Sequence, residues 1–156
     1  MGILSIASGS SCWRGLDYYK NKKIKNIEKI SDVEYNSIVS GTKDYSVYLN
    51  LKNPRKSTCN CPLANGKRII CKHIVATYFN VVQNSAKEFE EEQKKLQEEY
   101  EEYQNNQYKN AIKFINKMSK KELVEELNYI FDYAPEWVYD DFIRRNDIEG
   151  WLLVLA

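Results

Sequence analysis

Three of the four cysteines in this chain and its single histidine fall within one stretch, CNCPLANGKRIICKH. These residues are Cys59, Cys61, Cys71 and His73. Thiolate sulfur and imidazole nitrogen are the ligands that Zn²⁺ prefers, four at a time and in a tetrahedron. The stretch therefore predicts that one ion ties the end of a strand to the start of a helix.

The spacing of the four residues indicates how the backbone brings them together. The first two cysteines are one residue apart, so both can reach one ion only from extended or tightly turned chain. An Asn-Gly turn signal at residues 65–66 would return the chain to Cys71. His73 would then reach the ion from the first turn of a helix. Because four ligands fill the coordination shell, we expect one structural Zn²⁺ and no catalytic role for it.

Two other arrangements of these residues are open to the sequence. Without a metal they would be three buried thiols and a core histidine, but so dense a cluster of ligand types argues against this. A disulfide between Cys59 and Cys61 is disfavoured, because it would close a very short loop and because we expect a reducing compartment.

We expect a cytoplasmic protein, because the N-terminus lacks the basic flank and apolar run of a signal peptide. No apolar run approaches the ~20 residues that span a bilayer, so no membrane contact is expected.

At 156 residues, the chain has the length of about one domain, or of a small domain with an appendage. We expect a zinc-binding module over residues 1–85, with the finger itself at about 44–84. Helical spacing of Trp13 and Leu16 predicts a first helix, and apolar spacing after His73 predicts another over about 72–84. Between them the sequence predicts three strands, in KKIKNIEKI, EYNSIVS and DYSVYLNL, with a hairpin turn at Gly41-Thr42.

The chain changes character at Ala86. Residues 86–156 predict an acidic helical region, which begins with a long helix over about 86–118 because the stretch lacks Gly and Pro. Ser119 and Glu122 match a capping box, which predicts a second helix. Pro135 would suit the first position of a third. The fold class expected is α+β: a small sheet module with its finger, followed by an all-helical segment.

The near-neutral net charge of +1 hides an asymmetry between these two parts. Residues 1–85 hold thirteen Lys and Arg against five Asp and Glu, whereas residues 86–156 hold ten against seventeen. A basic half attracts phosphate backbones. The acidic half could equally neutralise it, and the sequence leaves both interpretations open.

The letters CNCP and CKHIVA resemble the SWIM zinc finger family. The preceding WRGLDYYKNKKIKNI and YNSIVSGTKDYSVYLNL resemble the lead-in of bacterial SWIM proteins, an RG-x-x-YY element followed by strands. The resemblance covers roughly residues 12–82. It implies a ββα zinc module that binds DNA or proteins, with the four residues of the opening stretch as ligands. This sequence reads GTKDY where a serine more commonly follows the glycine. It contains no neighbouring helicase or nuclease domain from which an enzymatic role could be inferred.

Two functions follow from these patterns, and the sequence does not choose between them. The first is nucleic-acid binding, with DNA favoured over RNA. It would use basic residues before and within the finger: Lys52, Arg55, Lys56, Lys67, Arg68 and Lys72. The alternative is a protein-interaction adaptor that docks partners on the helices of residues 86–156.

We expect no catalysis and no small-molecule substrate. A nucleophilic cysteine needs a base, but Cys12 lies outside the cluster and the only histidine is committed to metal. Asp140 and Asp141 are adjacent on a predicted helix and point apart, which does not suit acid–base chemistry.

Overall fold

The computed structural model describes residues 2–146 and residue 148. Part of the expected acidic region, residues 147 and 149–156, therefore lies outside the described residues. The fold is mixed α+β, as predicted, with a small antiparallel sheet followed by a helical segment. The chain divides into two units, Met1–Leu96 and Gln97–Ala156.

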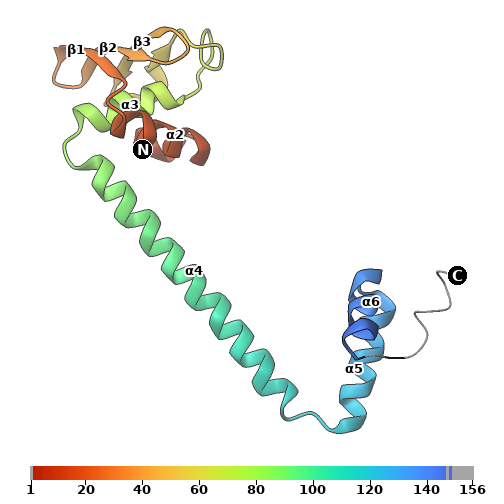
Figure 1. Ribbon diagram of the computed structural model, residues 1–156. Coiled ribbons are helices and arrows are strands. Elements are labelled where there is room, and N and C mark those ends of the chain that lie inside the picture. Colours follow the sequence, from red (N-terminus) through yellow and green to blue (C-terminus); the bar gives the residue numbers. More distant parts are fainter. Residues whose placement is uncertain (1, 147, 149–156) are drawn as a thin grey trace, which may run out of the picture. The chain divides into compact units, whose positions relative to one another are not determined.

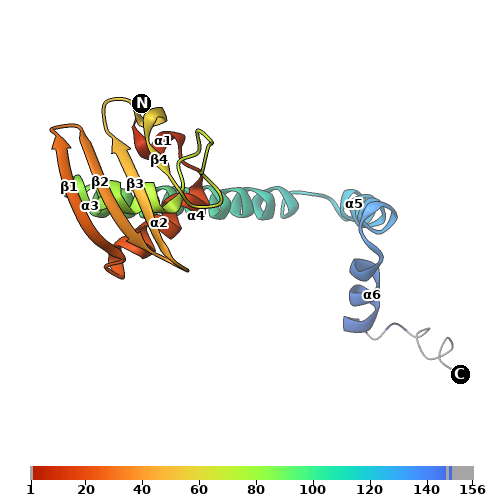
Figure 2. The ribbon, with the colours of Figure 1, turned by 90° about the horizontal axis from the view of Figure 1, so that it is seen from above.

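The N-terminal unit is built on a four-stranded antiparallel sheet in the order β1-β2-β3-β4 (Figure 2). The strands are β1 Ile24–Ser31, β2 Glu34–Ser40, β3 Asp44–Asn50 and β4 Thr58–Cys59. The first three confirm the strands predicted from the sequence. β2 and β3 pair in continuous register across the predicted turn, from Glu34 opposite Asn50 to Ser40 opposite Asp44.

The two faces of this sheet differ in chemistry because successive side chains point to opposite sides. One face is buried and contains Val39, Tyr45, Val47 and Leu49. The other face is mainly polar. Its side chains, which line one concave surface, include Asn26, Glu28, Asn36, Ser46, Tyr48 and Thr58. The sheet is therefore covered on one side and open on the other.

Helices cover the apolar face (Figure 1). They are α1 Ile3–Ile6, α2 Gly9–Lys20 and α3 Lys72–Val81. The side chain of Ser8 caps α2 by accepting a hydrogen bond from the backbone N–H of Ser11. Gly15 permits α2 to approach α3 closely, because a Cβ at this position would lie 2.5 Å from Cγ1 of Val75.

One buried polar contact joins the sheet to α3. The hydroxyls of Ser37 on β2 and Thr77 on α3 lie 2.6 Å apart, and Thr77 also donates to the carbonyl of His73. Buried hydroxyls need such partners, since an unpaired one costs about 1–3 kcal/mol. The contact therefore helps to fix the position of α3 on the sheet.

The long helix α4, Ser85–Ile115, begins immediately after α3. The helix expected over 72–84 ends earlier, at Val81, because Val82 is extended and Asn84 takes a left-handed φ of 63°. This turn directs Ala86 and Phe89 back into the core of the N-terminal unit. The ring of Phe89 lies 5.2 Å from that of Trp13 and 5.7 Å from that of Phe79.

The C-terminal unit continues α4 and adds α5 Lys120–Tyr133 and α6 Glu136–Arg145. α5 begins at the predicted capping box, in which Ser119 and Glu122 each bond the backbone of the other. Pro135 lies at the N-cap of α6, one residue before the expected position. The fixed φ of proline suits both the N-cap and the first helical position. The carbonyl of Pro135 accepts a hydrogen bond from the backbone N–H of Val138, which begins the helix. Phe131 of α5 packs against Phe142 of α6, with ring centroids 4.9 Å apart.

Among the residues that the structure describes, no helix has the length and apolar character needed to cross a membrane. α4 is long enough, but its many glutamates and lysines rule it out.

The packing of Phe89 predicts that the first turns of α4 stabilise the N-terminal unit. We expect Phe89→Ala to lower the free energy of unfolding by about 3 kcal/mol, because it removes a buried ring and leaves a cavity. Urea unfolding of the zinc-loaded protein would measure this.

Tyr108→Ala is the matched control, because Tyr108 is also an aromatic residue of α4 and is 68% exposed. We expect it to change the free energy of unfolding by less than about 1 kcal/mol. Equal effects of the two substitutions would show that Phe89 is not part of the core.

Candidate metal centre

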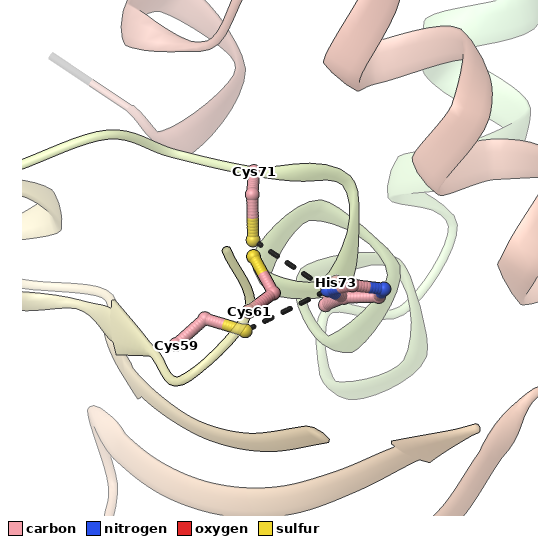
Figure 3. A group of neighbouring side chains, drawn as sticks. All are labelled: Cys59, Cys61, Cys71 and His73. Carbon is pink, nitrogen blue, oxygen red and sulfur yellow. Dashed lines mark hydrogen bonds between the residues drawn. The ribbon is translucent and has the colours of Figure 1, made fainter. Parts of the chain in front are cut away.

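Four cysteine and histidine side chains meet where the sheet adjoins α3 (Figure 3). Cys59 is the last residue of β4, and Cys61 lies in the turn that follows. Cys71 is the N-cap of α3, and His73 is in its first turn. All four are buried, and their ligand atoms lie within 4.8 Å of one another.

Local hydrogen bonds position the first two cysteines. Asn60 extends the pairing beyond β4, because its side-chain oxygen accepts from the backbone N–H of Ser46 at 3.0 Å. The carbonyl of Cys61 accepts from the backbone N–H groups of Ala64 and Asn65, which closes a tight turn. Gly66, with φ of 70°, supplies the left-handed residue that returns the chain toward α3.

The ring of His73 is fixed by its neighbours. It stacks on Tyr45 at 4.4 Å between centroids, and Tyr18 meets it edge-on at 5.4 Å. Nδ1 faces the sulfurs, 3.6 Å from Sγ of Cys59 and 3.9 Å from Sγ of Cys71. Nε2 points away from the sulfurs (Figure 3) and is buried without a hydrogen-bond partner among the described residues.

A hydrogen bond between Cys59 and Cys71 shifts the pKa values of the two thiols in opposite directions. A hydrogen bond from the Cys59 thiol lowers the pKa of Cys71, and backbone N–H groups of Ile74 and His73 act in the same direction. The hydrogen bond to Cys71 and burial raise the pKa of Cys59. A thiolate at the N-terminus of a helix is favoured by the helix dipole. A bound cation would favour the thiolate form of the other cysteines as well.

The donor set fits one Zn²⁺. Sulfur ligands bind zinc at about 2.3 Å, so neighbouring sulfurs around one tetrahedral ion lie about 3.8 Å apart. The four donors here are within 4.8 Å of one another, close to that geometry. Three sulfurs and one nitrogen complete a tetrahedral coordination shell. The clustering of these four ligands confirms the expectation of one structural Zn²⁺. Zinc bound here would stabilise the folded state, and its full shell would leave no position for a substrate or water.

Sequence reasoning does not identify the aromatic support of the histidine. The strand pattern predicts that Tyr45 points inward, but pairing it with His73 requires the position of α3 on the sheet. Tyr18 comes from α2, far from the finger in sequence. Only the helical spacing of residues 13–19 hints that one face of α2 points toward the finger.

The six basic residues proposed for nucleic acid do not all lie together. Four of them, Arg55, Lys56, Lys67 and Arg68, line one concave surface together with Tyr48 and Thr58. Lys52 lines a neighbouring concavity, which it shares with Arg55. Lys72 is separate, because its Nζ lies 4.3 Å from the centroid of Tyr18, beside the metal centre.

The coordination predicts a specific effect of losing one ligand. We expect Cys71→Ser to remove the bound zinc and to abolish cooperative unfolding of the N-terminal unit, because a structural zinc centre supplies folding energy directly. Zinc content by mass spectrometry and thermal unfolding followed by circular dichroism would test this.

Cys12→Ala is the matched control, because Cys12 is the buried cysteine outside the cluster. We expect this variant to retain one zinc per chain. An unchanged melting temperature for Cys71→Ser would contradict a structural role for the ion.

A comparison with protein families agrees with this geometry. The family model described as the SWIM zinc finger matches residues 45–81, a segment that includes all four metal-site residues. No curated protein and no solved structure matches the chain. The segment from β3 to the end of α3 is therefore a SWIM zinc finger, contained within a longer chain.

Proposed function

We propose that the N-terminal unit is a non-catalytic DNA-binding module that contacts DNA through two adjoining concave surfaces. The observation that carries this proposal is the convergence of Arg55, Lys56, Lys67 and Arg68 around one concavity. Cations gathered on one surface bind phosphates and release counterions. We call this region the basic surface.

The second concavity lies over the open face of the sheet and encloses about 650 Å³, within the usual range for small-ligand sites. It shares Tyr48, Thr58 and Gly66 with the basic surface. We call it the amide surface because its lining includes Asn26, Asn36, Asn60 and Asn65. Asparagine side chains carry both donors and acceptors, so they can pair with base edges.

The charges of the two surfaces suggest how a strand would lie. Glu28 lines the amide surface and would repel a phosphate there. The phosphate backbone would therefore follow the basic surface, and bases would lie over the sheet. Base edges are freely accessible only in single strands, so we expect tighter binding to single-stranded than to duplex DNA.

Support for a non-catalytic role comes from the metal centre and from Cys12. Four protein donors leave zinc no position for substrate. Burial raises the pKa of the Cys12 thiol, which disfavours the nucleophilic thiolate. We place the protein in the cytoplasm, where reducing conditions keep thiol ligands available to metal.

Protein docking is a second function, favoured by the side chains that α4, α5 and α6 leave exposed. Among the described residues after Phe89, none is buried, although this region includes Leu96, Ile112 and Trp137. Exposed apolar side chains at this density commonly mark interaction sites. The occupant of α4 is the subject of the next subsection.

The DNA proposal predicts that removing two cations from the basic surface weakens binding. We expect Lys67→Gln/Arg68→Gln to lower the affinity for single-stranded DNA at least several-fold. The slope of log affinity against log salt should become shallower by about one to two, because two phosphate contacts are lost. Fluorescence anisotropy with the zinc-loaded full-length protein at several salt concentrations would measure both.

Lys22→Gln/Lys23→Gln is the control, because it removes the same charge from exposed residues that line neither surface. Its affinity should stay within about twofold of the parent protein. Equal losses in the two double variants would indicate non-specific attraction to the basic half, and no binding by the parent protein would exclude the proposal.

A further inference from the structure

One side of α4 carries a stripe of exposed aromatic and aliphatic residues. Leu96, Tyr100, Tyr103 and Phe114 are 52%, 58%, 59% and 66% exposed. At 100° per residue, their spacing places them within about 60° of arc. Gln93, Gln107 and Ala111 fall on the same stripe, which is continuous with buried Phe89. The helix therefore has an apolar seam that nothing in the described chain covers.

The charges of α4 are separated along its length. From Ser85 to Tyr103 it contains eight glutamates and three lysines, and from Gln104 to Ile115 it contains two lysines and no carboxylate. Three further lysines follow by Lys121, again without a carboxylate. The first half is thus strongly acidic and the second half basic. A partner for this helix would need the opposite order of charge.

We propose that the seam of α4 is covered by α4 of a second copy of this chain, in antiparallel orientation. An antiparallel copy presents its basic half to the acidic half of the first, and the reverse holds at the other end. A parallel copy would place acidic against acidic and basic against basic. Charge complementarity therefore selects both the partner and its direction.

One register of the two antiparallel helices gives complementary packing along the seam. With Tyr100 opposite Gln107 of the second copy, Leu96 lies opposite Ala111 and Gln93 opposite Phe114. Each large side chain thus meets a smaller or more flexible one, as close packing of two helices requires. The two glutamines in the seam would favour this register over its neighbours, as polar residues do at core positions of coiled coils.

The same register pairs charges beside the seam. In this register Glu92 of one copy is two positions, or about 3 Å along the axis, from Lys113 of the other, within reach of the two long side chains. The two-fold axis makes this contact twice in each dimer. On the same flank and with the same offset, Lys95 approaches Asn110 and Glu99 approaches Asn106. Like charges are not opposed anywhere on this flank.

Charge reversal tests the proposal on the full-length, zinc-loaded protein by sedimentation velocity over a concentration series. We expect a concentration-dependent dimer. Glu92→Lys or Lys113→Glu alone should weaken it about tenfold, because each creates two like-charge contacts. The double variant exchanges the two charges and should restore the dissociation constant to within about threefold of the parent protein.

Glu91→Lys and Lys109→Glu are matched controls, because they make the same charge changes about 160° around the helix from the centre of the seam. They should leave the dimer within about twofold of the parent, with zinc content and helical circular dichroism unchanged in all variants. Failure of the double variant to recover, or equal weakening by the controls, would overturn the proposed register.

Cross-linking tests the direction. A mixture of chains carrying Tyr100→Cys and chains carrying Gln107→Cys should form a disulfide between the two kinds of chain under mild oxidation. Gln107→Cys alone should not, whereas a parallel pair would link Gln107→Cys to its own copy. Protein that remains monomeric at every concentration would overturn the proposal. None of these readouts depends on DNA, so the two proposals fail separately.

Discussion

The N-terminal unit depends on the convergence of three thiols and one imidazole at a single point. β4 has only two residues, Thr58 and Cys59, and too few ladder hydrogen bonds to hold the following loop by itself. The loop from Asn60 to Ile70 has mainly exposed side chains and contributes little apolar burial. An ion bound by Cys59, Cys61, Cys71 and His73 joins both ends of that loop to the sheet and α3. The metal centre also positions part of the basic surface, because Lys67 and Arg68 lie on the same loop.

The sequence predicts those parts of the fold whose signal is local. The alternation of Tyr45, Val47 and Leu49 is sufficient to identify β3 and its buried face. The ligand spacing identifies the metal-site residues because their chemistry is unusual and concentrated. Ser119 and Glu122 predict the start of α5, because a capping box needs only four consecutive positions.

Other features depend on contacts between distant segments and cannot be read locally. The end of α3 at Val81 is one example, because apolar spacing continues to Val82 while Asn84 and Phe89 together turn the next helix into the core. The division of the basic residues is another. Lys67 and Lys72 are five positions apart, but the turn at Gly66 and the start of α3 send them to different surfaces. Sequence proximity groups them, and the fold separates them.

The contact between Gly15 and Val75 bears on how far this finger can be moved from one protein to another. α2 lies outside the matched segment 45–81, yet its Gly15 approaches Val75 so closely that no larger residue fits without a shift. The finger therefore depends on packing against the helix that precedes it. If the matched segment alone were transferred into another protein, the side of α3 that packs on α2 would be exposed to solvent. A transferable fragment would have to begin before Gly9 and include all of α2. For the same reason, substitutions at these two positions should be correlated among proteins that share this arrangement.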